Sequence, residues 1–253
     1  MTENELSPVQ EKPTICIVGD PGAGKTRLAS LWPNAYFLDA EGGAASAVSP
    51  EYRSSFEVGP NLLEQLTKAV NAFTNCPYQD KRILYKDQPI GALVIDSLDA
   101  IQQVHKYTNL MAKAWKEPRQ MWGKLLDDIM PFVYLTRKLP IPIIWIAHVH
   151  VEEPVYQYEN LRKPGFRGIA TQGALEDQIK RWFDYILHIV VEEDYKRVCI
   201  VQPTVYKDYR ISAAKDRHNT FQFLGRNYFS LAVDEHGFPV TKAMETIYNR
   251  HVY

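Results

Sequence analysis

The segment ICIVGDPGAGKTRLA constrains the fold of this chain more than any other stretch of its sequence. Four apolar residues, 15–18, predict a buried strand, and the pattern G-x-x-x-x-G-K-T follows at residues 19–26. A helical run comes next, and Pro33 ends it. Because a strand, a glycine-rich loop and a helix occur in this order, the segment predicts a phosphate-binding loop (P-loop).

The residue types in the loop explain how it would hold a nucleotide. Its glycines allow backbone conformations that other residues disfavour, and they let N–H groups approach phosphate oxygens. We expect Lys25 to contact the β- and γ-phosphates and the Thr26 hydroxyl to coordinate Mg²⁺. The predicted ATP-binding residues are Gly19, Asp20, Pro21, Gly22, Ala23, Gly24, Lys25, Thr26 and Arg27.

Composition narrows the protein class without naming a ligand. A content of 45% hydrophobic and 23% charged residues is typical of a globular protein. The length of 253 residues suits one α/β domain with additions, or a domain and a small appendage. The net charge of −1 gives no overall attraction for nucleic acid, so any such contact would use local patches. Three widely spaced cysteines argue against a disulfide framework or a zinc site. With no apolar run of membrane-spanning length and no signal-peptide core, we expect a cytoplasmic protein without a membrane partner.

Apolar strand patterns alternate with helical patterns along most of the chain. The strands are expected at residues 35–38, 91–95 and 142–147, and the helices at 61–73, 99–114 and 120–138. This alternation predicts a mainly parallel sheet flanked by helices. Residues 186–191 and 197–201 predict an antiparallel hairpin toward the C-terminus. The expected organisation is a flexible leader at residues 1–12, an ATPase core at 13–220 and an extension packed on the core at 221–253.

Acidic residues lie at the ends of two predicted strands. Asp96 ends the apolar strand LVID, and Glu41 follows the earlier strand at residues 35–38. Asp96 is expected to hold Mg²⁺ through water. Many P-loop ATPases have Glu directly after this Asp, but Ser97 stands here, so the catalytic base must come from elsewhere. Glu41, in FLDAEGG, is the best candidate, with Asp39 and Asp99 as competitors, because parallel strand ends gather around the nucleotide.

Three further polar side chains follow predicted strands. His148 could contact the γ-phosphate or its attacking water and report its state to the next loop, although a histidine in this position can also simply pack. Lys215 and Arg217 are two residues apart, so their side chains would point the same way. We expect this pair to reach the nucleotide of a neighbouring subunit, the alternative being ordinary solvated cations.

Residues 151–172 predict a long irregular loop that carries alternating aromatic and cationic side chains. This composition suits stacking on unpaired bases with neutralisation of phosphates. A lid over a small substrate or a loop that only packs on the surface remain alternatives. The candidate residues for binding single-stranded DNA are Tyr156, Tyr158, Arg162, Lys163, Phe166 and Arg167.

Taken together, these segments resemble the core of RecA/RadA-type ATPases. GDPGAGKT resembles the family's Walker A motif, FLDAEGG its strand with the catalytic Glu, and LVIDSLDAI its Walker B motif. WIAHV stands where the family has a polar sensor, which is Gln in bacterial RecA, and AKDR resembles its basic pair that acts between subunits. The resemblance covers residues 13–217. D-x-E-G-G and V-I-D-S further resemble phage-encoded RecA-like ATPases of single-strand annealing and recombination.

The resemblance implies a RecA-like fold and a DNA-stimulated ATPase with ATP and Mg²⁺ as cofactors. It implies catalytic roles for Lys25, Glu41, Asp96, His148, Lys215 and Arg217. Single-stranded DNA, further copies of the chain in a ring or filament, and a single-strand binding protein are the implied partners, in the host cytoplasm if the protein is encoded by a phage. A small-molecule or nucleotide kinase with a lid loop, or a nucleotide-dependent regulatory switch, is the alternative.

Overall fold

The computed structural model describes residues 12–111, 113, 115, 117–158, 160–171, 174–193, 195–222, 225, 227–231 and 243–252. Apart from Lys12, the predicted leader lies outside these residues. Within the described part of the chain, no helix combines the length and the apolar character needed to cross a membrane.

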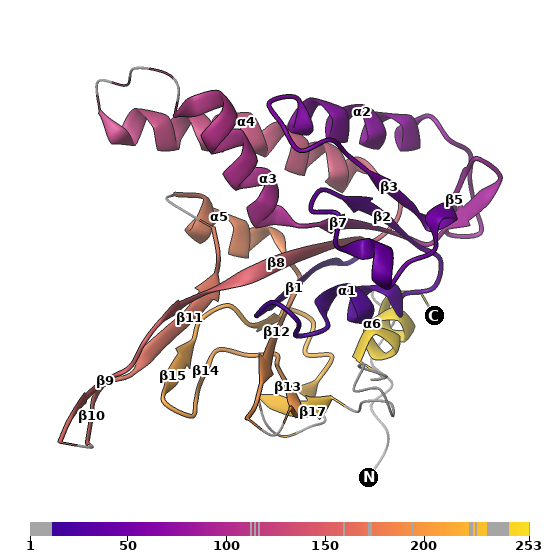
Figure 1. Ribbon diagram of the computed structural model, residues 1–253. Helices are drawn as coiled ribbons and strands as arrows, with labels where there is room; N and C mark the ends of the chain where they lie inside the picture. Colours follow the sequence, from indigo (N-terminus) through magenta and orange to yellow (C-terminus); the bar gives the residue numbers. More distant parts are fainter. Residues whose placement is uncertain are drawn as a thin grey trace, which may run out of the picture.

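Six parallel strands of the described chain form the centre of the main sheet (Figure 1). Their spatial order is β3, β2, β7, β8, β1, β12. The bounds are β1 Thr14–Gly19, β2 Ala35–Asp39, β3 Arg53–Ser55, β7 Ala92–Asp96, β8 Ile143–Glu152 and β12 Tyr185–Val191. Since these strands are parallel, their carboxyl ends meet at one edge. β8 lies between β1, which leads into the P-loop, and β7, which ends in Asp96.

Helices cover both faces of this sheet. One face carries α2 (Leu62–Thr74), α3 (Leu98–His105), α4 (Pro118–Lys138) and α5 (Ala174–Trp182), whereas the other carries α1 (Lys25–Ser30) and α6 (Ala243–Val252). The six residues of β1 are all buried, with Cys16 and Val18 on the first face and Ile15 and Ile17 on the second. This two-sided burial explains why the strands are continuously apolar. The predicted fold class is therefore confirmed.

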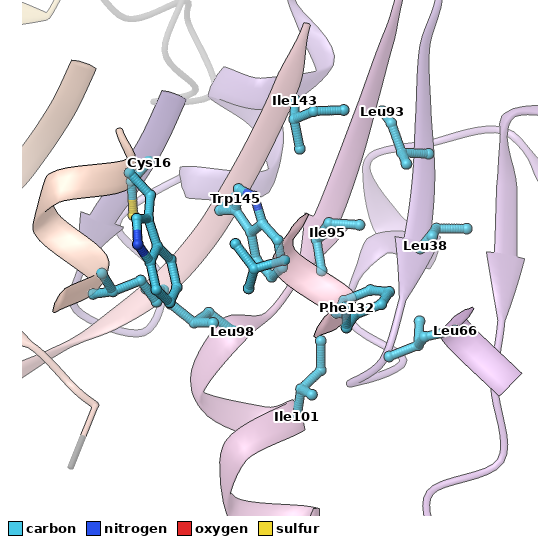
Figure 2. Packing of buried hydrophobic residues seen from close by; sticks show 14 of the residues in the cluster. Cys16, Leu38, Leu66, Leu93, Ile95, Leu98, Ile101, Phe132, Ile143 and Trp145 are labelled. Atoms are coloured by element: carbon cyan, nitrogen blue, oxygen red, sulfur yellow. The ribbon is translucent and has the colours of Figure 1, made fainter. Parts of the chain in front are cut away.

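The core under α2, α3 and α4 is dense and aromatic. Figure 2 shows Trp145 of β8 beside Ile95 of β7, with side chains of the overlying helices packed against them. Phe132 of α4 meets Trp145 edge to face, with ring centroids 5.8 Å apart. On the opposite face, Trp32, which follows α1, meets Tyr248 of α6 edge to face, with ring centroids 5.3 Å apart. Such pairs fix the helices on the sheet in one arrangement.

Antiparallel strands extend the sheet beyond β12. β13 (Arg197–Ile200) pairs with β12, which confirms the predicted hairpin, and β17 (Tyr228–Leu231) pairs with β13. The short strand β16 (Lys215–Asp216) pairs with the beginning of β12. Smaller elements are β4 (Tyr78–Gln79), β5 (Arg82–Tyr85) and β6 (Gln88–Ile90), the π-helical turn Lys106–Leu110 after α3, and the 3₁₀ turns Ala44–Ser46 and Pro50–Tyr52.

The prediction of an irregular loop at residues 151–172 is wrong. β8 continues to Glu152 and pairs with β11 (Gly165–Ile169), while β9 (Val155–Gln157) and β10 (Asn160–Lys163) form a hairpin beyond them. We call residues 149–169 the arm; it projects from the sheet in Figure 1. Pro154 and Pro164 interrupt both sides of the arm and hide the strand pattern in the sequence. At the base of the arm, β11 pairs with β15 (Tyr209–Ile211). β15 pairs in turn with β14 (Thr204–Tyr206), the strand that precedes it in the sequence.

Candidate nucleotide-binding site

The P-loop connects β1 to α1 at the carboxyl edge of the sheet. Gly22 and Gly24 have φ angles of 76° and 87°, in the left-handed region that favours glycine. A Cβ atom on Gly19 would lie 2.9 Å from the carbonyl oxygen of Ile189 on β12. The loop therefore needs glycine for its turns and for close packing against the neighbouring strand.

Lys25 lies back along the P-loop. Its Nζ atom donates hydrogen bonds to the carbonyl oxygens of Gly19 and Asp20, each at 3.0 Å. The residue is buried, and this desolvation lowers the pKa of its ammonium group. Two carbonyls thus hold the ammonium beside the loop that would bind the phosphates.

The two predicted metal-binding residues contact each other. Thr26 Oγ1 donates a hydrogen bond to Asp96 Oδ2 at 2.9 Å. Asp96 is only 3% exposed, and burial raises the pKa of its carboxyl group to about 7. A hydroxyl and a carboxylate are hard oxygen ligands of the kind that Mg²⁺ prefers, and a cation would compensate a buried negative charge. The donor set therefore fits Mg²⁺.

Glu41 lies in the loop after β2, at the same edge of the sheet. Its Oε1 accepts a hydrogen bond from Ser97 Oγ and lies 3.6 Å from Nδ1 of His148. Asp39, the competing candidate base, is fully buried, and its carboxylate accepts three backbone N–H groups between residues 41 and 44, at 2.7 to 3.2 Å. Asp39 therefore shapes the loop, while Glu41 reaches the groups of the site.

Asp99 binds His148 at two points. Its Oδ1 accepts a hydrogen bond from the backbone N–H of His148 at 2.9 Å, and its Oδ2 accepts one from the ring Nδ1 at 2.7 Å. Burial opposes ionisation of Asp99, but these hydrogen bonds outweigh it and lower its pKa. The hydrogen bond to Asp99 raises the pKa of His148. Although ligand atoms of Glu41, Asp99 and His148 lie within 4.8 Å of one another, hydrogen bonding and ionic attraction account for this closeness.

A cavity of about 530 Å³ opens at this edge, within the size range of small-molecule sites. A larger one of about 770 Å³ lies between α2 and α4, away from the P-loop. The smaller cavity contains the polar groups described above and is therefore the candidate site. Its lining comprises Pro21, Gly22, Gly24, Lys25, Thr26, Arg27, Glu41, Gly43, Ser46, Ala47, Asp96, His148 and Arg197.

Comparison with known proteins shows the family to which the chain belongs. A family model described as an AAA domain matches residues 11–218. The chain belongs to this AAA-domain family. Among solved structures, it is similar to the crystal structure of the RadB recombinase, with 15% sequence identity and a TM-score of 0.42, over 89% of this chain and 90% of that one. No curated protein sequence matches it.

Two arginines that reach the P-loop of this AAA domain come from distant strands. Arg197 of β13 donates from Nε to the carbonyl oxygen of Ala23 at 3.2 Å. Arg167 of β11 donates from Nη1 to Oδ2 of Asp20 at 3.0 Å, and its side chain is only 15% exposed. No sequence motif surrounds Arg197, so the sequence does not predict its place at the P-loop. The sequence predicts Arg167 to be a DNA-binding residue, whereas the structure places its side chain beside the P-loop.

The other candidate DNA-binding residues lie farther along the arm. Tyr156 is on β9, Arg162 and Lys163 are on β10, and Tyr158 lies in the turn between these strands. All four are exposed, Tyr158 by 89%. Phe166 lies on β11, near the base, and is half-buried. The outer half of the arm thus presents aromatic and cationic side chains together.

Lys215 and Arg217 lie away from the P-loop of their own AAA domain. β16 pairs with the beginning of β12, which is level with Ile15 at the beginning of β1. Lys215 Nζ donates to two carbonyls at the end of α5, including that of Phe183 at 2.7 Å, and Arg217 forms an ion pair with Asp184. These residues therefore lie at the opposite edge of the sheet from the P-loop.

Proposed function

We propose that this AAA domain is a Mg²⁺-dependent ATPase that binds single-stranded DNA through its arm and assists annealing or homologous recombination. One observation carries the proposal: β8 bears His148 at the nucleotide site and continues into the base of the exposed arm. The same strand therefore joins an ATPase site to a candidate DNA-binding surface.

The groups around the cavity suit ATP hydrolysis. Lys25 and the P-loop backbone would bind the β- and γ-phosphates, and Thr26 with Asp96 would hold Mg²⁺. Bound Mg²⁺ would neutralise charge on these phosphates. Glu41 would accept a proton from a water molecule while the oxygen of that water attacks the γ-phosphorus. The bond between the γ-phosphorus and the bridging oxygen of the β-phosphate would break, which gives ADP and phosphate.

The arm suits single-stranded DNA because it combines exposed rings with cations. Tyr156 and Tyr158 can stack on bases, which is worth about 1–3 kcal/mol per base. Arg162 and Lys163 lie beside them on β10 and can neutralise phosphates. This local patch supplies the positive charge that the net charge of −1 lacks.

Assembly is the second part of the proposal. The P-loop and the Lys215–Arg217 pair lie at opposite edges of the sheet, so head-to-tail stacking of subunits could bring one edge against the other. We propose rings or filaments in which Lys215 and Arg217 stabilise phosphate charge in the neighbouring site. A phage origin, a single-strand binding protein as partner and a cytoplasmic location belong to the same proposal.

The first experiment is the ATP hydrolysis rate of the purified protein with single-stranded DNA, with duplex DNA and without DNA, at low and moderate salt. We expect stimulation by single strands that weakens with salt. Parallel gel filtration with and without ATP would detect assembly. A rate that ignores DNA, with no complex formed in ATP, would reject the DNA function. A monomer that phosphorylates a small substrate would indicate a kinase, and ATP binding without turnover would indicate a switch.

A further inference from the structure

Asp99 is a buried acid whose two carboxylate oxygens accept hydrogen bonds from the same residue. It lies on the first turn of α3, and its side chain is 5% exposed. His148, at the edge of the cavity, supplies both donors, its backbone N–H at 2.9 Å and its Nδ1 at 2.7 Å. The carboxylate thus fixes both the backbone position and the ring orientation of His148.

This arrangement decides which ring nitrogen is available to a ligand. Nδ1 donates to Asp99, so Nε2 is the nitrogen of His148 that can bond to a phosphate oxygen in the cavity. A carboxylate acceptor on one side of an imidazole fixes its tautomer and orientation. Because phosphate oxygens are acceptors, Nε2 must carry a proton to bind them, and with Nδ1 also protonated the ring is then an imidazolium.

We propose that Asp99 is a positioning residue, which holds His148 so that its Nε2 donates a hydrogen bond to the γ-phosphate of bound ATP. The inference rests on the ATP-binding part of the proposed function and not on DNA binding. It also removes Asp99 from the candidates for catalytic base, because both of its oxygens are engaged by His148.

The charges facing His148 support this role. Asp99 on α3 and Glu41 after β2 stabilise the imidazolium, while burial and the ammonium of Lys25 on α1 oppose it. The net effect is a raised pKa for His148. Ala170, which directly follows β11, donates its backbone N–H to the His148 carbonyl oxygen at 2.8 Å. A function that needs the imidazolium is therefore present at low pH and is lost as pH rises through the pKa of His148.

The test compares Asp99→Asn, His148→Gln and the double variant. The imidazole titration of His148 is followed by NMR, with His148→Gln identifying its signal, and the affinities for ATP and ADP are measured with fluorescent analogues. We expect Asp99→Asn to lower the pKa of His148 and to reduce the preference for ATP over ADP about tenfold. In the His148→Gln background, Asp99→Asn should change this preference little.

Two results would overturn the inference. One is an unchanged His148 titration in Asp99→Asn, and the other is an equal loss of ATP preference in the His148→Gln background. Thermal unfolding checks that the variants fold. If Asp99→Asn does not fold, ¹⁵N shifts of the histidine rings in the wild-type protein decide the matter, since a neutral ring protonated at Nε2 alone would also overturn it. These readouts need neither DNA nor turnover, so they stand apart from the test of DNA stimulation.

Discussion

Arg167 on the arm and Asp20 in the P-loop form an ion pair, with Nη1 and Oδ2 3.0 Å apart. The guanidinium also lies over the ring of Tyr209, 5.0 Å from its centroid. β8 contributes His148 to the same edge of the sheet, so both strands at the base of the arm carry a side chain to the nucleotide site. The Arg167–Asp20 ion pair therefore anchors the arm to the phosphate-binding loop, while β8 leads into the same arm from His148 beside Glu41 and Asp99.

Removing the ion pair between Arg167 and Asp20 should weaken nucleotide binding. Arg167→Ala leaves the Asp20 carboxylate unpaired beside the loop, where it repels phosphate, so we expect roughly tenfold weaker ATP binding. Arg162→Ala is the matched control, because Arg162 is exposed on the arm, outside the cavity. Titration with a fluorescent ATP analogue measures both. Equal effects of the two substitutions on ATP affinity would contradict the assigned role of Arg167.

Glu41→Gln should separate ATP binding from hydrolysis. The amide keeps the shape of the side chain but cannot accept a proton from water, so we expect hydrolysis to slow about a hundredfold or more with ATP affinity preserved. Glu64→Gln, on the exposed surface of α2, is the control and should leave the rate unchanged. Steady-state phosphate release measures the rate. If Glu41→Gln turns over normally, another group is the base.

Tyr158→Ala should weaken single-stranded DNA binding without affecting the fold. Loss of one stacking platform costs about 1–3 kcal/mol, which is roughly 5- to 150-fold in affinity. Tyr195→Ala is the matched control, because Tyr195 is 80% exposed in the turn between β12 and β13. Fluorescence anisotropy with a labelled oligonucleotide compares the two. An unchanged affinity in Tyr158→Ala would remove this residue from the proposed surface.

The loss of ATP hydrolysis in Lys215→Ala should be restored by neighbouring subunits whose Lys215 is intact. Mixed with Lys25→Ala protein, whose own site is inactive but whose Lys215 is intact, the Lys215→Ala variant should recover ATP hydrolysis in shared assemblies. Thermal unfolding is needed as a control, since Lys215 also binds two carbonyls at the end of α5. Hydrolysis is measured across mixing ratios. Failure to recover at every ratio, with assembly intact, would reject action between subunits.

Ile247→Ala should destabilise the protein through the packing of α6. Ile247 is fully buried in the core on the α1 face, so the deletion should cost about 2–5 kcal/mol of unfolding free energy. Asn249→Ala, on the exposed side of α6, should change it by less than about 0.5 kcal/mol. Urea unfolding measures both. A small effect of Ile247→Ala would mean that α6 adds little to stability.

The sequence predicts those parts of the fold that rest on local patterns. The apolar strands, the glycine spacing of the P-loop and Asp96 at a strand end are each encoded within a few residues. Grouping Glu41 with His148 is also predictable, because carboxyl ends of parallel strands meet at one edge. These local signals suffice for the parallel sheet and the P-loop.

Other features depend on pairing between distant segments. Arg197 reaches Ala23 across 174 positions and Arg167 reaches Asp20 across 147, and no local pattern specifies either contact. The arm is hidden because Pro154 and Pro164 break its strands and because its outer residues lack a buried face to create an alternating pattern. The double hydrogen bond between Asp99 and His148 likewise appears only once α3 is packed beside β8.

β8 is one uninterrupted strand of ten residues, buried at its beginning and exposed toward its end. Strands rise about 3.3 Å per residue, so Tyr158 can lie roughly 30 Å from His148 along the arm. Over that length, a tilt of about 5° at His148 would move the tip by roughly 3 Å, which is close to one strand residue. β8 and the β9–β10 hairpin together would then turn a small displacement at His148, in the candidate nucleotide site, into a larger displacement at the tip of the arm.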